Sequence, residues 1–248
     1  MHFDVLTIFP EALAGFISVG VLGQAIDNGL MSVDLHDLRD FTDDPHRVVD
    51  DRPYGGGPGM LLKVEPIVRG IEEISTRMKQ RSYSKVLLSS QGRLFAQEDA
   101  INWAKLDGML LICGRYEGVD ERVVSFVDDE VSIGNYVLTG GEVAAGVIIE
   151  ATARMLTGTV GRFESVESDS FYDKEHLGPP QYTRPPQFRG LSVPQVLLSG
   201  DHKRIEQFRE EKAWEKTLHN RPDLVGLKQT KKSVSWPRDD LDSVETDG

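Results

Sequence analysis

Residues 109–118 read Met-Leu-Leu-Ile-Cys-Gly-Arg-Tyr-Glu-Gly, and this stretch decides the fold. Its five apolar residues predict a buried strand, Met109–Cys113, and the glycines around and after its end predict a turn. The same pattern occurs at two further predicted strands, Lys85–Ser89, followed by Gly92, and Glu130–Ile133, followed by Gly134. Open α/β sheets bind ligands beyond the carboxyl ends of their strands, and glycine lets backbone approach a ligand closely. The three turns together therefore predict a ligand site, although each one alone is more often only a turn.

Strands and helices alternate along the chain as far as Met155. Further strands are predicted over Phe3–Ile8 and Met31–Leu38. Apolar residues at helical spacing predict a helix over Val64–Lys79. Further helices are predicted over Gly20–Asn28, Gln97–Leu106, Asp120–Val127 and, from its small and apolar residues, Gly141–Met155. This alternation predicts an α/β fold, in which a parallel sheet carries helices on both faces.

The composition changes after Leu156. Residues 157–194 are rich in glycine, proline, serine and charge, and a helix is predicted from an N-cap at Asp201 to Leu218. We therefore predict an α/β domain over residues 1–160, an interdomain linker over 161–175, a small helical domain over 176–238 and a disordered acidic tail over 239–248.

The overall composition indicates a soluble, cytoplasmic protein. The 248 residues are 39% hydrophobic and 27% charged, without an apolar run of the roughly 18–20 residues that span a bilayer. The N-terminal residues lack the basic and apolar regions of a signal peptide. The single cysteine, Cys113, cannot form an internal disulfide and fits a reducing cytoplasm.

Charge is distributed unevenly. The net charge of −12 argues against a nucleic-acid partner. Residues 174–232, however, hold twelve Lys and Arg against seven Asp and Glu. This basic segment is either a phosphate-binding surface or a helix with mixed surface charge, and charge alone does not decide between the two.

Common cofactor and metal motifs are missing from the sequence. It has no phosphate loop and no Gly-x-Gly-x-x-Gly between a strand and a helix, which disfavours ordinary nucleotide cofactors. Its six histidines lack His-x-x-x-His spacing, which argues against a zinc site. The run Pro53–Met60 is either a flexible linker or a shaped loop near the site, and the adjacent charged residues 50–52 favour the loop. Arg115 and Glu117, on either side of Tyr116, form either a solvated turn or a binding pair for substrate, cofactor or metal.

Several longer motifs follow one another between residue 3 and about residue 199. They are Phe3–Glu11, Pro53–Met60, Gly114–Gly118, Ser132–Glu142, Asp169–Phe171 and Gln181–Pro185. In this order they resemble the bacterial tRNA (guanine-N(1)-)-methyltransferase family of the SPOUT superfamily, and the resemblance covers most of the chain. One departure is Ser90, where the family usually has proline, which bears on the stiffness of that loop and not on the chemistry. The acidic tail after Arg238 also lies outside the shared pattern.

The resemblance implies a homodimer that binds S-adenosylmethionine in a deep trefoil knot. The knot would be made by three loops, Leu87–Gly92, Gly114–Gly118 and Ile133–Gly141. The cofactor-binding residues implied in these loops are Leu87, Ser89, Gln91, Gly92, Gly114, Tyr116, Ile133, Gly134, Asn135, Tyr136, Val137, Leu138, Gly140 and Gly141. Because knots are nearly absent from proteins, this expectation depends on the family alone.

The resemblance also implies methyl transfer to N(1) of the guanine on the 3′ side of the tRNA anticodon. Asp169 would take the proton from N(1), and Arg154 would stabilise negative charge on the guanine carbonyl oxygen. Both would reach across from the partner subunit. Glu117 would assist a Mg²⁺ ion, for which no ligand residue is assigned, and the helical domain would grip the anticodon stem and loop.

Other interpretations stay open at this point. Without the family, Asp169 would be a polar-loop or cap residue, and Arg154 a cation at a helix C-terminus. Tyr116, Tyr136 and Phe171 are either core aromatics or rings that stack on a base. The alternative functions are methylation of a ribose by the same superfamily, non-catalytic RNA binding, and a dehydrogenase with an atypical dinucleotide site.

Overall fold

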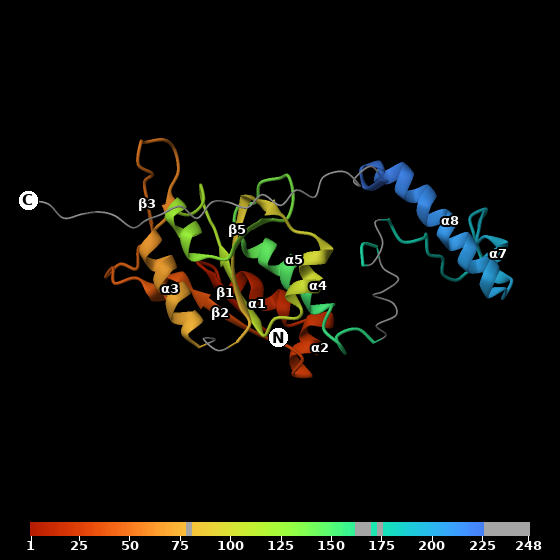
Figure 1. The fold of residues 1–248 in the computed structure, drawn as a ribbon, viewed down its shortest axis with the longest axis horizontal. Helices are drawn as coiled ribbons and strands as arrows, with labels where there is room; N and C mark the ends of the chain where they lie inside the picture. Colours follow the sequence, from red (N-terminus) through yellow and green to blue (C-terminus); the bar gives the residue numbers. More distant parts are fainter. Residues whose placement is uncertain (78–80, 162–169, 173–175, 226–248) are drawn as a thin grey trace, which may run out of the picture. The chain divides into compact units, whose positions relative to one another are not determined.

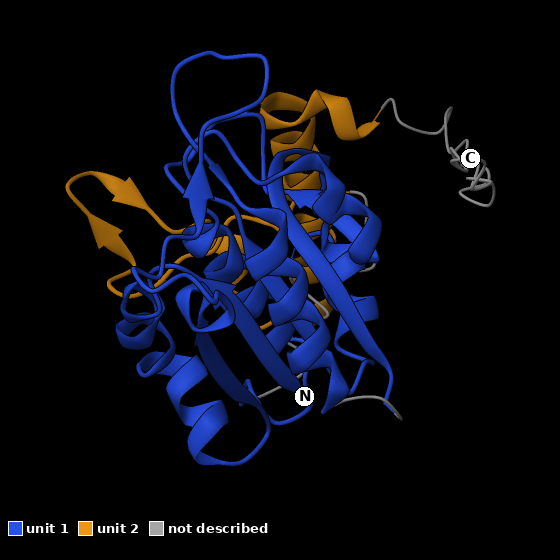
Figure 2. Cartoon of the chain, turned by 90° about the vertical axis from the view of Figure 1, so that its left-hand side faces the viewer, with its two compact units in different colours: residues 1–172 blue, residues 173–248 orange. Residues whose placement is uncertain are grey.

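The computed structural model describes residues 1–77, 81–161, 170–172 and 176–225 of the chain (Figure 1). The chain divides into two compact units, Met1–Tyr172 and Asp173–Gly248, which Figure 2 distinguishes by colour. The division falls within the predicted linker, residues 161–175. The predicted acidic tail, residues 239–248, lies outside the described residues.

The first unit is built on a five-stranded sheet. All five strands are parallel, and they lie in the order β2-β1-β6-β5-β7. Their bounds are His2–Thr7 for β1, Ser32–Asp37 for β2, Tyr83–Leu94 for β5, Gly108–Cys113 for β6 and Asp129–Ser132 for β7. The five predicted strands and the α/β class are therefore confirmed.

Side chains that alternate along the strands face two hydrophobic layers. Phe3 and Val5 of β1 face one layer, which contains α1 (Glu11–Ile17), α2 (Gly20–Asp27), α4 (Gln97–Trp103) and α5 (Glu142–Ala153). Leu6 faces the other layer, which contains α3 (Val64–Thr76) and the 3₁₀ helices η1 (Leu38–Phe41) and η2 (Glu121–Phe126). Every residue of the central strand β6 is buried, because both of its faces are covered. The prediction of helices on both faces is confirmed (Figure 1).

Strand β5 is longer than predicted because a loop interrupts it without ending it. Leu88 and Arg93 both lie opposite Val131 of β7, so residues 89–92 bulge out of the strand between two paired segments. A Cβ atom on Gly92 would collide with the backbone of Glu130 and Val131. The glycine is therefore required for the loop to rejoin the sheet.

The segment after β7 returns to the carboxyl end of β6. Strand β7 pairs with β5 on the side away from β6, yet the N–H of Gly141 donates to the carbonyl of Gly114 at 2.9 Å. Arg115 and Gly140 form an isolated antiparallel bridge beside this bond. The return brings the loops after β6 and β7 together, and the trefoil knot itself stays a prediction.

The sequence analysis did not predict several short elements. The helix α1 spans seven residues and is too short to show a clear helical period. Strands β3 (Asp50–Asp51) and β4 (Leu61–Leu62) pair in antiparallel fashion at the base of the glycine-rich run Pro53–Met60. The predicted helix Val64–Lys79 is observed as α3, which ends at Thr76.

Among its described residues, 176–225, the second unit contains one long helix, α8 (His202–Asn220). The side chain of Asp201 accepts a hydrogen bond from the N–H of Arg204 at 3.2 Å, which confirms the predicted N-cap. Thr217 is buried and its hydroxyl oxygen accepts from the N–H of Leu177 at 2.9 Å. The remaining elements are β8 (Gln187–Phe188), β9 (Leu191–Ser192), α7 (Gln195–Leu198) and η3 (Pro222–Val225). Across the described residues of both units, none of the helices has the length and apolarity to cross a membrane.

Candidate active site

The loop within β5 and the loops that follow β6 and β7 line one cavity of about 380 Å³. The cavity lies at the carboxyl ends of parallel strands, where α/β sheets bind ligands. The predicted cofactor residues among its lining are Leu87, Ser89, Gln91, Gly114, Tyr116, Ile133, Gly134, Tyr136, Val137, Leu138, Gly140 and Gly141. Three turns that are far apart in the sequence therefore meet at a single site.

Two glycines are required where the loops after β6 and β7 touch. A Cβ atom on Gly141 would lie 2.7 Å from Cα of Cys113, which is closer than two carbon atoms can pack. A Cβ atom on Gly140 would collide with the side chains of Arg115 and Glu142. Since neither position has room for a side chain, backbone forms this wall of the cavity.

Two tyrosines of the cavity are exposed and are not core aromatics. Tyr116 is 54% exposed and Tyr136 is 56% exposed. Tyr116 also has a φ of +59°, a left-handed conformation that costs a non-glycine residue about 1–3 kcal/mol. Both rings are therefore available to a ligand, and the conformation of Tyr116 is held by the surrounding loop.

A buried ion pair joins the loop after β6 to the start of α5. The guanidinium of Arg115 donates to Glu142 at 3.0 Å, and the hydroxyl of Thr7 donates to the other oxygen of Glu142 at 2.7 Å. The Glu142 side chain is 6% exposed, and Arg115 also lies over the ring of Phe9 at 4.7 Å. The partner of Arg115 is thus Glu142, and Arg115 does not act with Glu117 as a local charged pair.

The sequence analysis missed the role of Glu142, although Glu142 stands at the end of one of the quoted motifs. A glutamate in the first turn of a helix is stabilised by the helix dipole and gives no sign of a distant arginine. Thr7 and Glu142 are 135 positions apart, so no local pattern links them. Glu142 is a charged residue between a Gly-Gly turn and an apolar helix. Because a buried charge needs a partner, this position could have indicated a buried ion pair.

Cys113, at the end of β6, does not supply a nucleophile. Burial raises the pKa of its thiol well above the usual range, and the nearby carboxylate of Glu142 raises that pKa further. The thiol therefore stays protonated at neutral pH, and a protonated thiol is a poor nucleophile.

The glycine-rich run Pro53–Met60 is anchored beside the cavity. The N–H of Glu117 donates to the carbonyl of Met60 at 3.1 Å, and the N–H of Leu62 donates to that of Gly118 at 3.1 Å. Gly59 has a φ of +85°, and a Cβ atom there would collide with the Glu117 side chain. Glu117 lines the cavity and is exposed. The run is therefore a shaped loop held against the cavity wall.

Three predicted site residues that the structure describes do not line the cavity. Gly92 and Asn135 do not line it, whereas the departing residue Ser90 does. Arg154 is the C-cap of α5, which begins at the cavity and runs for twelve residues, or about 18 Å. Asp169 lies outside the described residues. Phe171, which follows it closely, is 39% exposed with a φ of +70°.

Comparison with known proteins places this geometry in a family. The family model "tRNA (Guanine-1)-methyltransferase TrmD" matches residues 1–227. A tRNA (guanine-N(1)-)-methyltransferase of Persephonella marina is 50% identical over 226 residues, which are 91% of this chain and 88% of the relative. One of Geobacter sulfurreducens is 46% identical over 250 residues, which cover 100% of this chain and 99% of the relative. The chain therefore belongs to the tRNA (guanine-1)-methyltransferase family.

Proposed function

We propose that this protein transfers a methyl group from S-adenosylmethionine to N(1) of the guanine on the 3′ side of the anticodon in tRNA. The observation that carries the proposal is a cavity formed by the loop within β5 and the loops after β6 and β7, in a chain matched by the family over residues 1–227. The ribose-methylating, non-catalytic and dehydrogenase alternatives gain no comparable support.

The cavity suits S-adenosylmethionine in size and in chemistry. Its volume of about 380 Å³ lies within the range of roughly 300–1,000 Å³ that small-molecule sites occupy. The crowded glycines Gly140 and Gly141 leave backbone groups on its wall, and apolar Val137 and Leu138 stand beside them. Backbone N–H and C=O groups could pair with the edge of adenine and with the amino-acid end of the cofactor. When bound, the cofactor supplies an electrophilic methyl group on a sulfonium.

Within this proposal, Asp169 and Arg154 act on the guanine. N(1) of guanine carries a proton at neutral pH, so its lone pair cannot attack until a base takes that proton. A carboxylate such as that of Asp169 accepts it as attack begins. Negative charge then develops on the guanine carbonyl oxygen, where a guanidinium such as that of Arg154 stabilises it.

The position of Arg154 favours a site shared between two subunits. Arg154 stands one helix length, about 18 Å, from the end of α5 that touches the cavity, so its side chain does not reach the cavity of its own subunit. The outer face of α5 carries exposed Val143 and Val147, and Phe16 of α1 is exposed beside Gly146 of the same helix. An exposed apolar face of this kind is typical of a subunit interface. We therefore propose a homodimer in which Arg154 and Asp169 act at the partner's cofactor.

The second unit is proposed to bind the anticodon stem and loop. Lys203, Arg204, Arg209 and Lys216 are exposed on α8, while the face that carries Ala213 and Thr217 is buried. Exposed cations on one helix provide phosphate contacts despite the negative charge of the whole chain. A tRNA substrate agrees with a place in the cytoplasm.

A Mg²⁺ ion is proposed to take part with help from Glu117. Glu117 is an exposed carboxylate on the cavity wall. The described residues offer no group of three acidic or histidine ligands at the cavity. Mg²⁺ commonly keeps several waters and shares the rest of its ligands with substrate, and such a site needs only one or two carboxylates.

The proposal is tested by giving unmodified tRNA transcripts and methyl-labelled S-adenosylmethionine to the full-length protein. After digestion to nucleosides, the label should appear in 1-methylguanosine. Gly141→Ala should lose activity because its Cβ atom meets Cα of Cys113, whereas Gly161→Ala, with nothing within 4 Å, should keep it. Label in ribose-methylated nucleosides, or binding of tRNA without any transfer, would overturn the proposal.

A further inference from the structure

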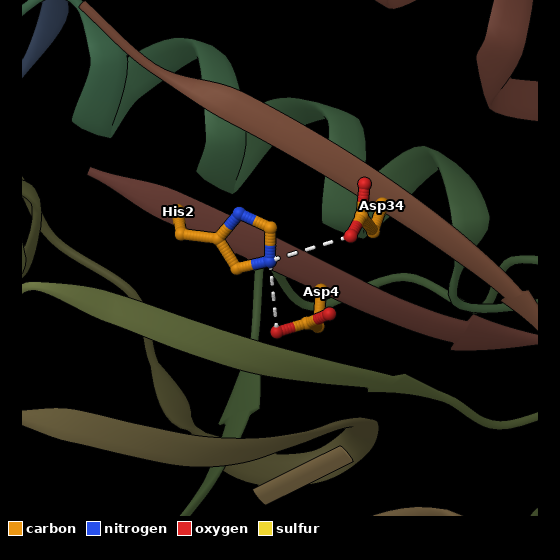
Figure 3. A group of neighbouring side chains, drawn as sticks. All are labelled: His2, Asp4 and Asp34. Carbon is orange, nitrogen blue, oxygen red and sulfur yellow. Dashed lines mark ion pairs between the residues drawn. The ribbon is translucent and has the colours of Figure 1, made fainter. Parts of the chain in front are cut away.

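A second cluster of chemically active side chains lies at the other end of the sheet. His2 and Asp4 of β1 and Asp34 of β2 point toward one another (Figure 3). Nε2 of His2 lies 3.2 Å from Oδ2 of Asp4 and 3.7 Å from Oδ2 of Asp34. His2 is the first residue of β1, and none of the three cluster residues lines the cavity.

The register of the two strands places two carboxylates side by side. Asp4 and Asp34 are direct partners in the parallel pairing of β1 with β2, and the Asp4 side chain is only 3% exposed. Like charges directly opposite each other destabilise a sheet unless something neutralises them. His36 and Tyr83 also contact Asp4, whereas Nε2 of His2 approaches Asp34 only to 3.7 Å. A metal ion can bind His2 and both carboxylates at once.

The spacing of the three ligand atoms fits a tetrahedral metal ion. Bonds of about 2.0–2.2 Å at tetrahedral angles separate neighbouring ligand atoms by roughly 3.3–3.6 Å. The two distances from His2, 3.2 and 3.7 Å, lie within about 0.1 Å of that interval, and all three atoms lie within 4.8 Å of one another. We propose that His2, Asp4 and Asp34 bind one divalent transition-metal ion of the zinc class, with water as the fourth ligand.

Neighbouring side chains hold two of the three ligands in place. Nδ1 of His2 is 2.7 Å from the hydroxyl of Ser32, which leaves Nε2 for the metal. The hydroxyl of Tyr83 donates to Asp4 at 2.8 Å, and Nε2 of His36 lies 2.7 Å from the other Asp4 oxygen. Such outer partners orient ligands and raise metal affinity. The ligands themselves stand on rigid paired strands, and half-exposed Asp34 gives an ion access from solvent.

The ligand set favours zinc over the Mg²⁺ proposed for the cavity. An imidazole with two carboxylates suits Zn²⁺, while Mg²⁺ prefers oxygen ligands in an octahedron. The two carboxylates and a neutral imidazole balance the charge of a divalent ion. The missing His-x-x-x-His spacing argued against zinc, but that pattern identifies sites on one helix and cannot reveal ligands on two strands. The ion would join β1 to β2 and leave the cavity unchanged.

The test uses the full-length protein without a histidine tag, stripped of metal with a chelator and titrated with ZnCl₂ in a calorimeter. We expect one site per chain, weakened about 100-fold or more by His2→Gln and by Asp34→Asn. The matched controls His46→Gln and Asp27→Asn, at exposed positions of the first unit that are not part of the cluster, should leave affinity unchanged. Circular dichroism verifies folding, and the half-exposed Asp34 keeps the test valid if His2→Gln fails to fold.

Co²⁺ substitution gives a second readout, because four-coordinate Co²⁺ absorbs visible light far more strongly than six-coordinate Co²⁺. The wild-type protein should show the four-coordinate spectrum, and Asp34→Asn should lose it. Absence of binding, binding that survives both variants, or a six-coordinate spectrum would each overturn the proposal. S-adenosylmethionine affinity should be the same with and without zinc, so this outcome is independent of the proposed methyl transfer.

Discussion

Replacement of Glu142 by alanine should weaken both the fold and the cofactor site. The change leaves Arg115 without its buried partner and Thr7 without its acceptor. Removing one member of a buried ion pair costs about 3–5 kcal/mol. Because the Arg115 side chain is 25% exposed and can be partly solvated, we expect the lower end, about 3 kcal/mol. For a chain of this size that corresponds to a fall of about 6–12 °C in Tm.

The effect on the cavity follows from the position of the ion pair between Arg115 and Glu142. Arg115 and Glu142 flank the bond between Gly141 and Gly114, so the loss of Glu142 should loosen backbone that lines the proposed cofactor site. Calorimetry should show the fall in Tm and a weaker affinity for S-adenosylmethionine, with Glu142→Gln intermediate because it still accepts from Thr7. Glu150→Gln, at an exposed position of the same helix, is the control. A change in Tm below about 2 °C with unchanged cofactor affinity would refute the reasoning.

Three further predictions concern catalysis and tRNA binding. Asp169→Asn should slow single-turnover methyl transfer by roughly 10²–10⁴-fold with little change in binding and with partial rescue at high pH; a near-normal rate would remove Asp169 as the base. Subunits carrying Arg154→Ala, mixed with subunits carrying Gly141→Ala, should regain about one working site per mixed dimer, and no recovery after verified exchange would exclude a shared site. Replacing Lys203 and Arg204 by glutamine should lower the salt dependence of tRNA binding by about two units of slope without changing cofactor affinity, whereas an unchanged slope would place the phosphate contacts elsewhere.

The strands and the glycine turns could be predicted from the sequence because both are local signals. A run such as Met109–Cys113 between turn residues is recognisable without knowledge of the rest of the chain. The meeting of the three turns follows from parallel strands, whose carboxyl ends share one edge of the sheet. The extension of β5 beyond Gly92 was not predictable, since it depends on the pairing of Arg93 with Val131 across a bulge.

Contacts between residues far apart in the chain could not be predicted from the sequence. The partner of Arg115 is 27 residues away, and the hydrogen bond of Thr7 to Glu142 spans 135. The pairing of Asp4 with Asp34 depends on strand register, which the hydrophobic pattern alone did not assign. Arg154 shows the converse limit. The family resemblance implies a role at the base of the partner's site, and the structure adds that Arg154 stands at the end of α5 away from the cavity of its own subunit.

The most direct test of the central claim is to locate the methyl group on a single tRNA. An unmodified transcript with guanine on the 3′ side of the anticodon is treated with the protein and S-adenosylmethionine, and its fragments are sequenced by mass spectrometry. The account predicts one added methyl, on N(1) of that guanine, and none when adenine replaces it. A methyl group on a ribose, on another base, or on the adenine-substituted transcript would contradict the account.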